Sequence, residues 1–194
     1  MRPWDKRLAF AACLLPLAWL VLQAATGGLG ANPIETGTRF LGDWALRFLL
    51  LTLAVTPLRH LTGWTGWMRY RRMLGLFCFF YAGLHMTSYV ALDQFFDWAA
   101  IGRDLAKRRY MTIGMATLAL LLPLAATSTD AMVRRLGGPR WKKLHRLVYP
   151  AAILAVLHFT LMVKGPPLEP AAYGLVLALL LGWRAWRLRR HSPS

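Results

Sequence analysis

The sequence predicts an all-α membrane protein, a bundle of six transmembrane helices with both termini in the cytoplasm. Three observations support this prediction. Of the 194 residues 57% are hydrophobic, the apolar residues fall into six long runs, and most basic residues lie on one side of those runs. A run of about 20 apolar residues is long enough to cross a bilayer as a helix. The runs therefore set the fold class.

The six runs follow one another along the whole chain, with short loops between them. We expect each to be a helix, because a segment surrounded by lipid must satisfy its backbone hydrogen bonds internally. In order, the predicted spans are 8–26, 40–57, 73–92, 110–127, 146–163 and 171–186. They form a single domain over residues 1–194, which ends in a short basic cytoplasmic tail at 187–194.

The first run has one alternative interpretation, a cleaved signal peptide. A basic start, "MRPWDKR", precedes it and small residues, "AATGG", follow it. Its apolar stretch is longer than the core of a typical signal peptide. We therefore expect it to be retained as the first helix.

The basic residues predict the orientation of the bundle. With the N-terminus inside, seventeen Lys and Arg residues fall in cytoplasmic segments and six fall outside, with Arg47 left within a span. The positive-inside rule therefore favours a cytoplasmic location for both ends. Anionic lipid headgroups at the helix ends account for the net charge of +16, so this charge gives no reason to expect a nucleic-acid partner.

Familiar catalytic motifs are missing from the sequence. Cys13 and Cys78 each fall within an apolar run without CxxC or CxxCH spacing, so covalent haem attachment and zinc binding are unsupported. The chain has no GxSxG motif, no HExxH motif and no glycine-rich phosphate loop. The informative residues are therefore the ionisable ones inside the membrane, which are costly there and are candidates for function.

Three such residues fall at one depth in the outer half of the predicted bundle. Counted from the outer ends of their spans at 1.5 Å per residue, His85 lies about 12 Å deep, His158 about 9 Å and Arg47 about 10 Å. Imidazoles from two helices can ligate both faces of a haem iron, and an arginine can neutralise a haem propionate. We therefore predict a haem held by His85 and His158, with Arg47 beside it.

Each of these residues also has a purely structural interpretation. A histidine inside a membrane is often hydrogen-bonded across a helix interface without any cofactor. Arg47 can instead extend its side chain to the outer headgroups. The shared depth of the two histidines favours the haem interpretation for that pair.

His145 lies at the inner mouth of the fifth span, thirteen residues before His158, which corresponds to a rise of about 20 Å along a continuous helix. At about 100° per residue the two side chains do not share a face, although Pro150 between them can bend the helix. Three roles stay open for His145: ligand of a second, inner haem, partner of a quinone oxygen, or contact with phosphate headgroups.

One histidine on the third span and a pair spaced by thirteen residues on the fifth resemble the ferric reductase-like transmembrane domain. Local segments resemble one branch more closely, the haem-binding membrane subunits of bacterial protein-methionine-sulfoxide reductase systems. These segments are "GGLGANPIE", "RRMLGLFCFFYAGLHMTSY", "TSTDAM", "RRLGGPRWKKLHRLVY" and "HF" at His158. The resemblance runs through nearly all six spans.

The resemblance implies a haem b protein of the bacterial inner membrane, with one or two haems on His85, His145 and His158. It implies electron transfer from membrane quinol to a periplasmic, molybdopterin-dependent methionine sulfoxide reductase, the partner in a heterodimer. FMN has also been attributed to the family. Where the wider superfamily carries a second histidine on the third span, this chain has Arg71 and Arg72.

The short loops agree with an electron-transfer role. None is long enough for a nicotinamide, flavin or molybdenum domain, so we expect a partner to reduce the sulfoxide. The alternative function for this chain is a stand-alone, ferric reductase-like electron carrier in the membrane. A cytoplasmic flavin reductase would then supply its electrons. Lys107, Arg108 and Arg109 on the outer side belong either to a docking surface or to a helix start that faces headgroups.

Two other classes of protein lead to different expectations. A transporter would be expected to have broken helices in matching halves of the chain, and no such repeat is visible in the sequence. A purely structural membrane subunit would be colourless after purification.

Overall fold

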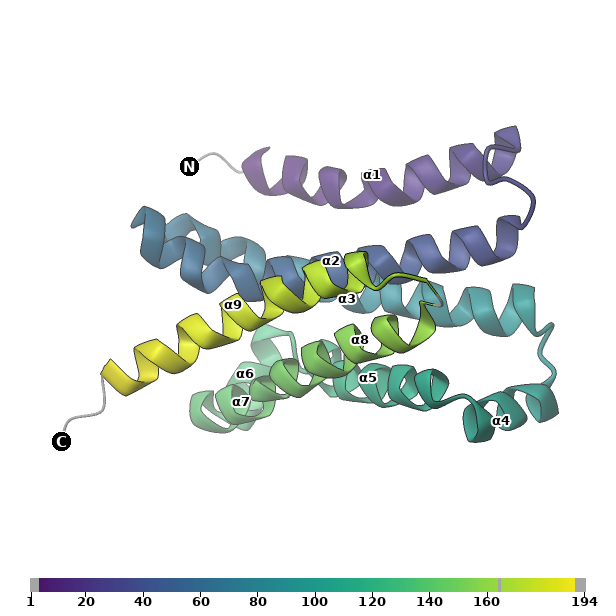
Figure 1. The fold of residues 1–194 in the computed structure, drawn as a ribbon. Helices are drawn as coiled ribbons and strands as arrows, with labels where there is room; N and C mark the ends of the chain where they lie inside the picture. Colours follow the sequence, from purple (N-terminus) through teal and green to yellow (C-terminus); the bar gives the residue numbers. More distant parts are fainter. Residues whose placement is uncertain (1–3, 164, 191–194) are drawn as a thin grey trace.

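The computed structural model describes residues 4–163 and 165–190. Within these ranges it contains six helices that are long and apolar enough to cross a membrane, and it has no strand. The prediction of an all-α fold with six spans is confirmed. The beginning of α1 and the end of α9 lie at the same end of the bundle (Figure 1).

Six long helices make up the bundle, and shorter elements join them. The long helices are α1 (Trp4–Thr26), α2 (Pro33–Thr62), α3 (Met68–Ser88), α5 (Arg109–Ala126), α8 (Val148–Met162) and α9 (Leu168–Arg190). The short α-helices are α4 (Trp98–Lys107), α6 (Asp130–Leu136) and α7 (Gly138–Leu144). A 3₁₀ turn at Thr65–Trp67 precedes α3, and a π-helical segment at Tyr89–Asp93 follows it.

Helix α2 extends well beyond the predicted span 40–57, because capping residues rather than apolar content set its ends. The Asn32 side chain accepts a hydrogen bond from the backbone N–H of Glu35, and Pro33 occupies the first turn. The helix stops at Gly63, whose φ of +68° is the left-handed conformation that glycine adopts most readily. Hydropathy detects only the apolar middle of such a helix.

The last helix likewise extends beyond its predicted span, 171–186. Residues 187–190 of the predicted tail continue α9, which runs without interruption to Arg190. Residues 191–194 of that tail lie outside the described residues, as do Arg2 and Lys164 of the basic residues used to predict the orientation.

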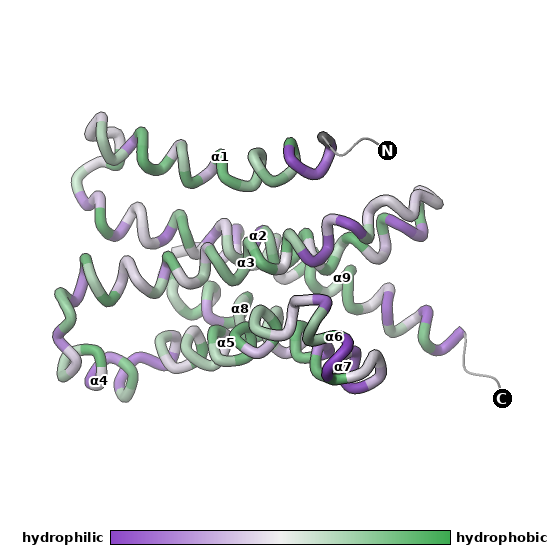
Figure 2. The backbone as a smooth tube through the Cα atoms, turned by 180° about the vertical axis from the view of Figure 1, so that it is seen from behind, coloured by the Kyte–Doolittle hydropathy of each residue, from purple (hydrophilic) through white to green (hydrophobic). Residues whose placement is uncertain are grey.

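The core lies where α2 packs on α3, with α5 and α8 paired beside them (Figure 1). Leu53 of α2, Tyr81 of α3 and Ala151 and Ala152 of α8 are completely buried. Hydrophobic residues run along the middle of the bundle, and hydrophilic residues gather at α6, α7 and the end of α9 (Figure 2). This distribution matches the hydrocarbon core and polar borders of a bilayer.

Tyr81 joins α1 to α3. Its hydroxyl donates to the carbonyl of Cys13 at 2.9 Å and accepts from the N–H of Leu17 at 3.1 Å. In a regular helix these two backbone groups would bond to each other. The hydroxyl instead lies between them, next to Pro16, which has no N–H to donate.

The chain leading into the predicted fifth span, 146–163, is divided into separate elements. Helix α7 ends at Leu144, a 3₁₀ turn covers His145–Leu147, and α8 begins at Val148. Pro150 explains the break, since it cannot donate to the carbonyl of Arg146 four residues earlier and its ring disfavours an α-helix there. His145 and His158 therefore do not belong to one continuous α-helix.

Candidate haem site

His85 occupies the last turn of α3, close to the beginning of α2. Its Nδ1 lies 2.8 Å from the carbonyl oxygen of Thr38. The Thr38 hydroxyl in turn lies 2.6 Å from that of Ser88, one turn beyond His85. Because a carbonyl oxygen only accepts, Nδ1 carries the proton, and Nε2 keeps an unshared lone pair.

His158 repeats this arrangement on α8. Its Nδ1 lies 2.7 Å from the carbonyl oxygen of Tyr110, in the first turn of α5. This imidazole too has its proton on Nδ1 and its lone pair on Nε2. Metal-bound histidines typically donate the other ring N–H to a carbonyl or a carboxylate, which fixes the tautomer and the ring orientation. Both rings are therefore prepared to bind a metal through Nε2.

The two rings lie against each other, with centroids 6.2 Å apart and planes at 79°. A metal–imidazole bond is about 2 Å long, so imidazoles on opposite sides of one metal place their ring centres roughly 6 Å apart. A free metal ion would need more protein ligands, and the described residues hold no group of three or more His, Cys, Asp or Glu side chains that could bind one. Two histidines suit haem, whose macrocycle supplies the other ligands.

Two glycines, Gly42 and Gly114, lie so close to the imidazoles that a larger residue would crowd the rings. A Cβ at Gly114 of α5 would lie 2.9 Å from Nδ1 and Cε1 of His158, and one at Gly42 of α2 would lie 3.1 Å from Nδ1 of His85. Neither glycine was predicted from the sequence to be part of the site. A glycine within a helix lowers helix stability by about 1 kcal/mol relative to alanine, so its presence can indicate that a neighbour approaches closely. Other glycines in the spans, such as Gly182, would meet nothing within 4 Å of an added Cβ, so glycine alone does not identify the site.

Arg47 faces the first turns of α9. Its Nε donates to the Tyr173 hydroxyl at 2.8 Å, and one Nη lies 3.9 Å from the Glu169 carboxylate. The Tyr173 ring meets the ring of Phe159, the neighbour of His158, edge to face at 5.7 Å. Arg47 thus reaches the histidine pair through intervening side chains, and Tyr173 and Glu169 already partner its guanidinium.

His145 lies apart from this pair, at the other end of α8. Its Nε2 is 3.0 Å from the Thr127 hydroxyl, which itself donates to the Pro123 carbonyl at 2.6 Å. Nε2 is therefore the donor, and a metal bond at this nitrogen would replace the hydrogen bond to Thr127. The Trp141 ring stacks on the imidazole at 3.9 Å. Unlike His85 and His158, His145 does not present a free Nε2.

The basic residues predicted to lie on the outer side are divided between two helices. Lys107 ends α4 and Arg109 begins α5, with Arg108 between them. Arg108 donates to the Tyr110 hydroxyl at 3.0 Å and pairs with Asp104 at 2.9 Å. The hydrogen bond with Tyr110 and the Asp104 charge raise the pKa of Arg108. Arg108 therefore already has partners within its own chain.

Comparison with known proteins identifies the family. Residues 41–156 match the family described as the ferric reductase like transmembrane component. The matched stretch contains Arg47, His85 and His145 and ends two residues before His158. Three relatives from different bacteria carry one name, protein-methionine-sulfoxide reductase heme-binding subunit MsrQ.

The relative from Rhodospirillum rubrum is 61% identical over 95% of this chain and 91% of its own length. The chain belongs to the MsrQ family. The family member from Herminiimonas arsenicoxydans is 50% identical over 97% of this chain and 88% of its own length, and that from Caulobacter vibrioides is 46% identical over 96% and 89%. With six apolar spans in a transmembrane family, the protein is a multi-pass membrane protein.

Proposed function

We propose that this protein is a haem b electron-transfer subunit that carries electrons across the bacterial inner membrane. One observation carries the proposal: His85 and His158 hold their Nδ1 protons on backbone carbonyls and lie 6.2 Å apart. Haem bound there supplies one-electron chemistry, because its iron changes oxidation state by one electron. The relatives' printed name, which includes heme binding, supports this choice of cofactor.

His85 and His158 bind the haem iron in this proposal. The carbonyls of Thr38 and Tyr110 fix the two rings, and Gly42 and Gly114 leave space behind them. Arg47 neutralises a propionate, a role in which it would share its guanidinium with Tyr173 and Glu169. The cation also favours the reduced haem, since reduction adds negative charge.

We place electron entry at the end of the bundle that holds His145. The beginning of α1 and the end of α9 lie there, and the density of basic residues favours the cytoplasmic side. His145 either ligates an inner haem after giving up its hydrogen bond to Thr127, for a total of two haems, or orients a quinol oxygen. Membrane quinol is the proposed donor, and FMN is a further redox group to be tested.

The proposed acceptor is a separate periplasmic, molybdopterin-dependent methionine sulfoxide reductase that forms a heterodimer with this protein. The relatives are named as subunits of a protein-methionine-sulfoxide reductase, which supports such a partner. Sulfoxide reduction takes place on that partner. This chain delivers the electrons.

The test uses protein purified in detergent with its bound cofactors. We expect a Soret band, a pyridine haemochrome spectrum of haem b, and one or two haems per chain. A reduced quinol analogue should reduce the haem, and adding the oxidised sulfoxide reductase should reoxidise it. Flavin released by acid would report FMN. A colourless protein that gains no Soret band when incubated with haemin would refute the proposal.

A further inference from the structure

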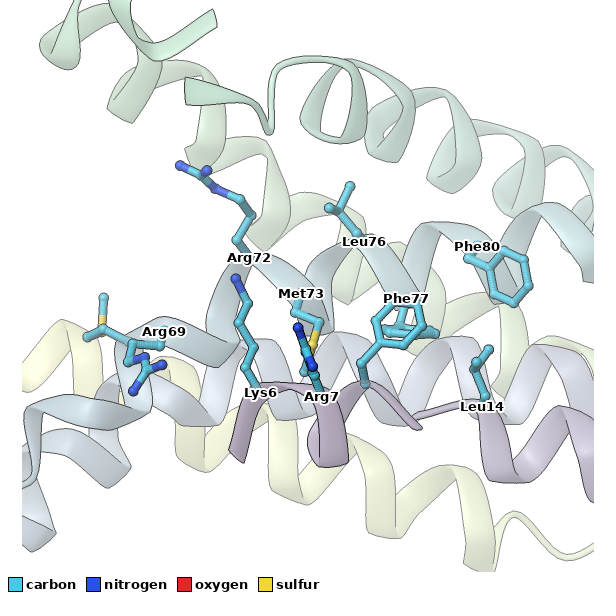
Figure 3. Close-up of a pocket in the computed structure, with 11 residues that line it drawn as sticks. Lys6, Arg7, Leu14, Arg69, Arg72, Met73, Leu76, Phe77 and Phe80 are labelled. Carbon is cyan, nitrogen blue, oxygen red and sulfur yellow. The ribbon is translucent and has the colours of Figure 1, made fainter. Parts of the chain in front are cut away.

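A groove of about 900 Å³ lies between the first half of α1 and α3 (Figure 3), and neither His85 nor His158 lines it. Its lining comes from the first half of α1 and the first four turns of α3. The lining residues are Lys6, Arg7, Phe10, Leu14, Met68, Arg69, Arg72, Met73, Leu76, Phe77 and Phe80. A volume of this size is within the range of ligand sites in proteins.

The groove is cationic at one end. Lys6, Arg7, Arg69 and Arg72 gather toward the end of the bundle where α1 begins (Figure 3). The described lining includes no acidic residue. Arg72 pairs with Asp130 of α6 at 2.6 Å, and this bond lowers the pKa of Asp130, so the carboxylate stays ionised. The lining itself therefore has a net positive charge, which attracts an anion.

The other end of the groove is apolar. Leu14, Phe77 and Phe80 lie there, away from the cations (Figure 3). Phe10 and Phe80 are 51% and 40% exposed although their rings lie against that of Phe77. Both helices are membrane spans, so this end faces the hydrocarbon part of the bilayer. The groove is therefore cationic at one end and apolar at the other, which complements an amphiphile with an anionic headgroup and an apolar chain.

Helix α1 leaves this space because it contacts the bundle at few points. Among its described residues only Cys13, Pro16 and Leu20 are buried. Tyr81 fixes its backbone at Cys13 and Leu17, in the middle of the helix. Between this attachment and the N-terminal end of α1, α3 presents phenylalanine and arginine side chains to the groove.

We propose that the groove between α1 and α3 binds an anionic membrane phospholipid, with the phosphate on the cations and an acyl chain along the phenylalanines. Basic pockets between transmembrane helices bind lipid phosphates in this way. A quinol fits less well, because its neutral headgroup gains little from the positive charge of the lining. FMN carries a phosphate but no acyl chain to cover the apolar end. The inference is independent of the proposed haem function.

The test is a native mass spectrometry titration of the detergent-purified protein with phosphatidylglycerol, and with phosphatidylcholine of the same acyl chains. We expect phosphatidylglycerol to bind more tightly. Lys6→Gln combined with Arg69→Gln should weaken its binding by about 30-fold, because each cation near an anionic headgroup contributes about fivefold. The matched control, Arg103→Gln combined with Lys107→Gln on α4, removes the same charge and should bind phosphatidylglycerol as the wild type does.

A second variant tests the apolar end without changing charge. Leu14→Trp fills the space beside Phe80 and should also weaken phosphatidylglycerol binding, while the haem spectrum stays unchanged. If the charge variant does not fold, phosphatidylglycerol binding by Leu14→Trp alone tests the proposal. The proposal is overturned if phosphatidylcholine binds as tightly, if the groove variants bind phosphatidylglycerol like wild type, or if the bound species has the mass of FMN or a quinone.

Discussion

The imidazoles of His85 and His158 lie with their ring centres 6.2 Å apart and each donate Nδ1–H to a carbonyl on another helix. Helix α3 supplies one ring and α8 the other. The acceptors, Thr38 and Tyr110, belong to α2 and α5. Four helices thus fix the positions of the two imidazoles, which makes the pair a rigid element of the bundle and not a flexible contact.

Replacing either ligand should remove the haem. In His85→Ala or His158→Ala one of the two proposed iron ligands would be lost, and most of the Soret absorbance should disappear while the protein still inserts into the membrane. The haem-to-protein ratio of purified material measures this. His60→Ala at the end of α2, where the ring packs on Trp183 at 5.4 Å, is the control and should keep its haem. Full haem retention in both ligand variants would rule out the assignment.

Gly114→Ala should lower haem occupancy without removing a ligand. The added Cβ would come within 2.9 Å of the His158 ring, so the ring must shift from its position beside Tyr110. Overpacking of this kind typically costs about 1–3 kcal/mol. Gly42→Ala, with its closest contact at 3.1 Å, should have a smaller effect in the same direction.

The control for the glycine variants is Gly182→Ala on α9, where a Cβ would meet nothing within 4 Å. Haem titration of the apoprotein compares the three variants. Equal haem affinity in Gly114→Ala and Gly182→Ala would show that the close approach has no consequence for binding.

Hydropathy and helix geometry predicted more of this site than is usual for a single sequence. The six spans and the shared depth of His85 and His158 follow from counting residues along helices of known rise. The structure brings these two rings together, as that depth predicted. Whether they bind haem iron stays a prediction. Arg47, predicted at the same depth, instead contacts Tyr173 and Glu169 on α9.

Other features could not be read from the sequence. A membrane helix that is apolar on all sides gives no pattern to indicate which face meets which neighbour. The contact of Tyr81 with the α1 backbone, and the approach of Gly42 and Gly114 to the imidazoles, depend on those faces. The separate helix α7 was also missed, because the basic segment before His145 is too polar to be counted in an apolar run.

Arg47→Leu should lower the reduction potential of the haem or its occupancy. The guanidinium favours the reduced state, since reduction adds negative charge near a cation, and its loss removes that preference. Redox titration followed by visible absorbance measures the change. Arg39→Leu, which removes a half-exposed arginine paired with Glu35, is the control and should leave the potential near wild type. Unchanged potential and haem content in Arg47→Leu would count against the propionate contact.

Tyr81→Phe should destabilise the protein while the haem spectrum persists. The hydroxyl satisfies the carbonyl of Cys13 and the N–H of Leu17, and removing one partner of a buried hydrogen bond costs about 1–3 kcal/mol. Thermal or denaturant unfolding in detergent reports the loss. Tyr70→Phe, a half-buried tyrosine on the same helix, is the comparison. Similar unfolding of both variants would mean that α1 closes its own hydrogen bond when the hydroxyl is removed.

Replacing His145 distinguishes two roles for this residue, electron entry and packing. If His145 binds an inner haem or orients a quinol, His145→Ala should leave the outer haem spectrum largely intact and slow its reduction by quinol. The pair formed by His85 and His158 lies at the other end of α8 from His145, so the lost imidazole does not perturb that pair directly. Thr127→Val, which removes the hydroxyl at 3.0 Å from Nε2, should give a smaller effect of the same kind. Stopped-flow reduction by a soluble quinol analogue compares the variants. Rates equal to wild type in His145→Ala would leave this histidine as a packing residue on Trp141.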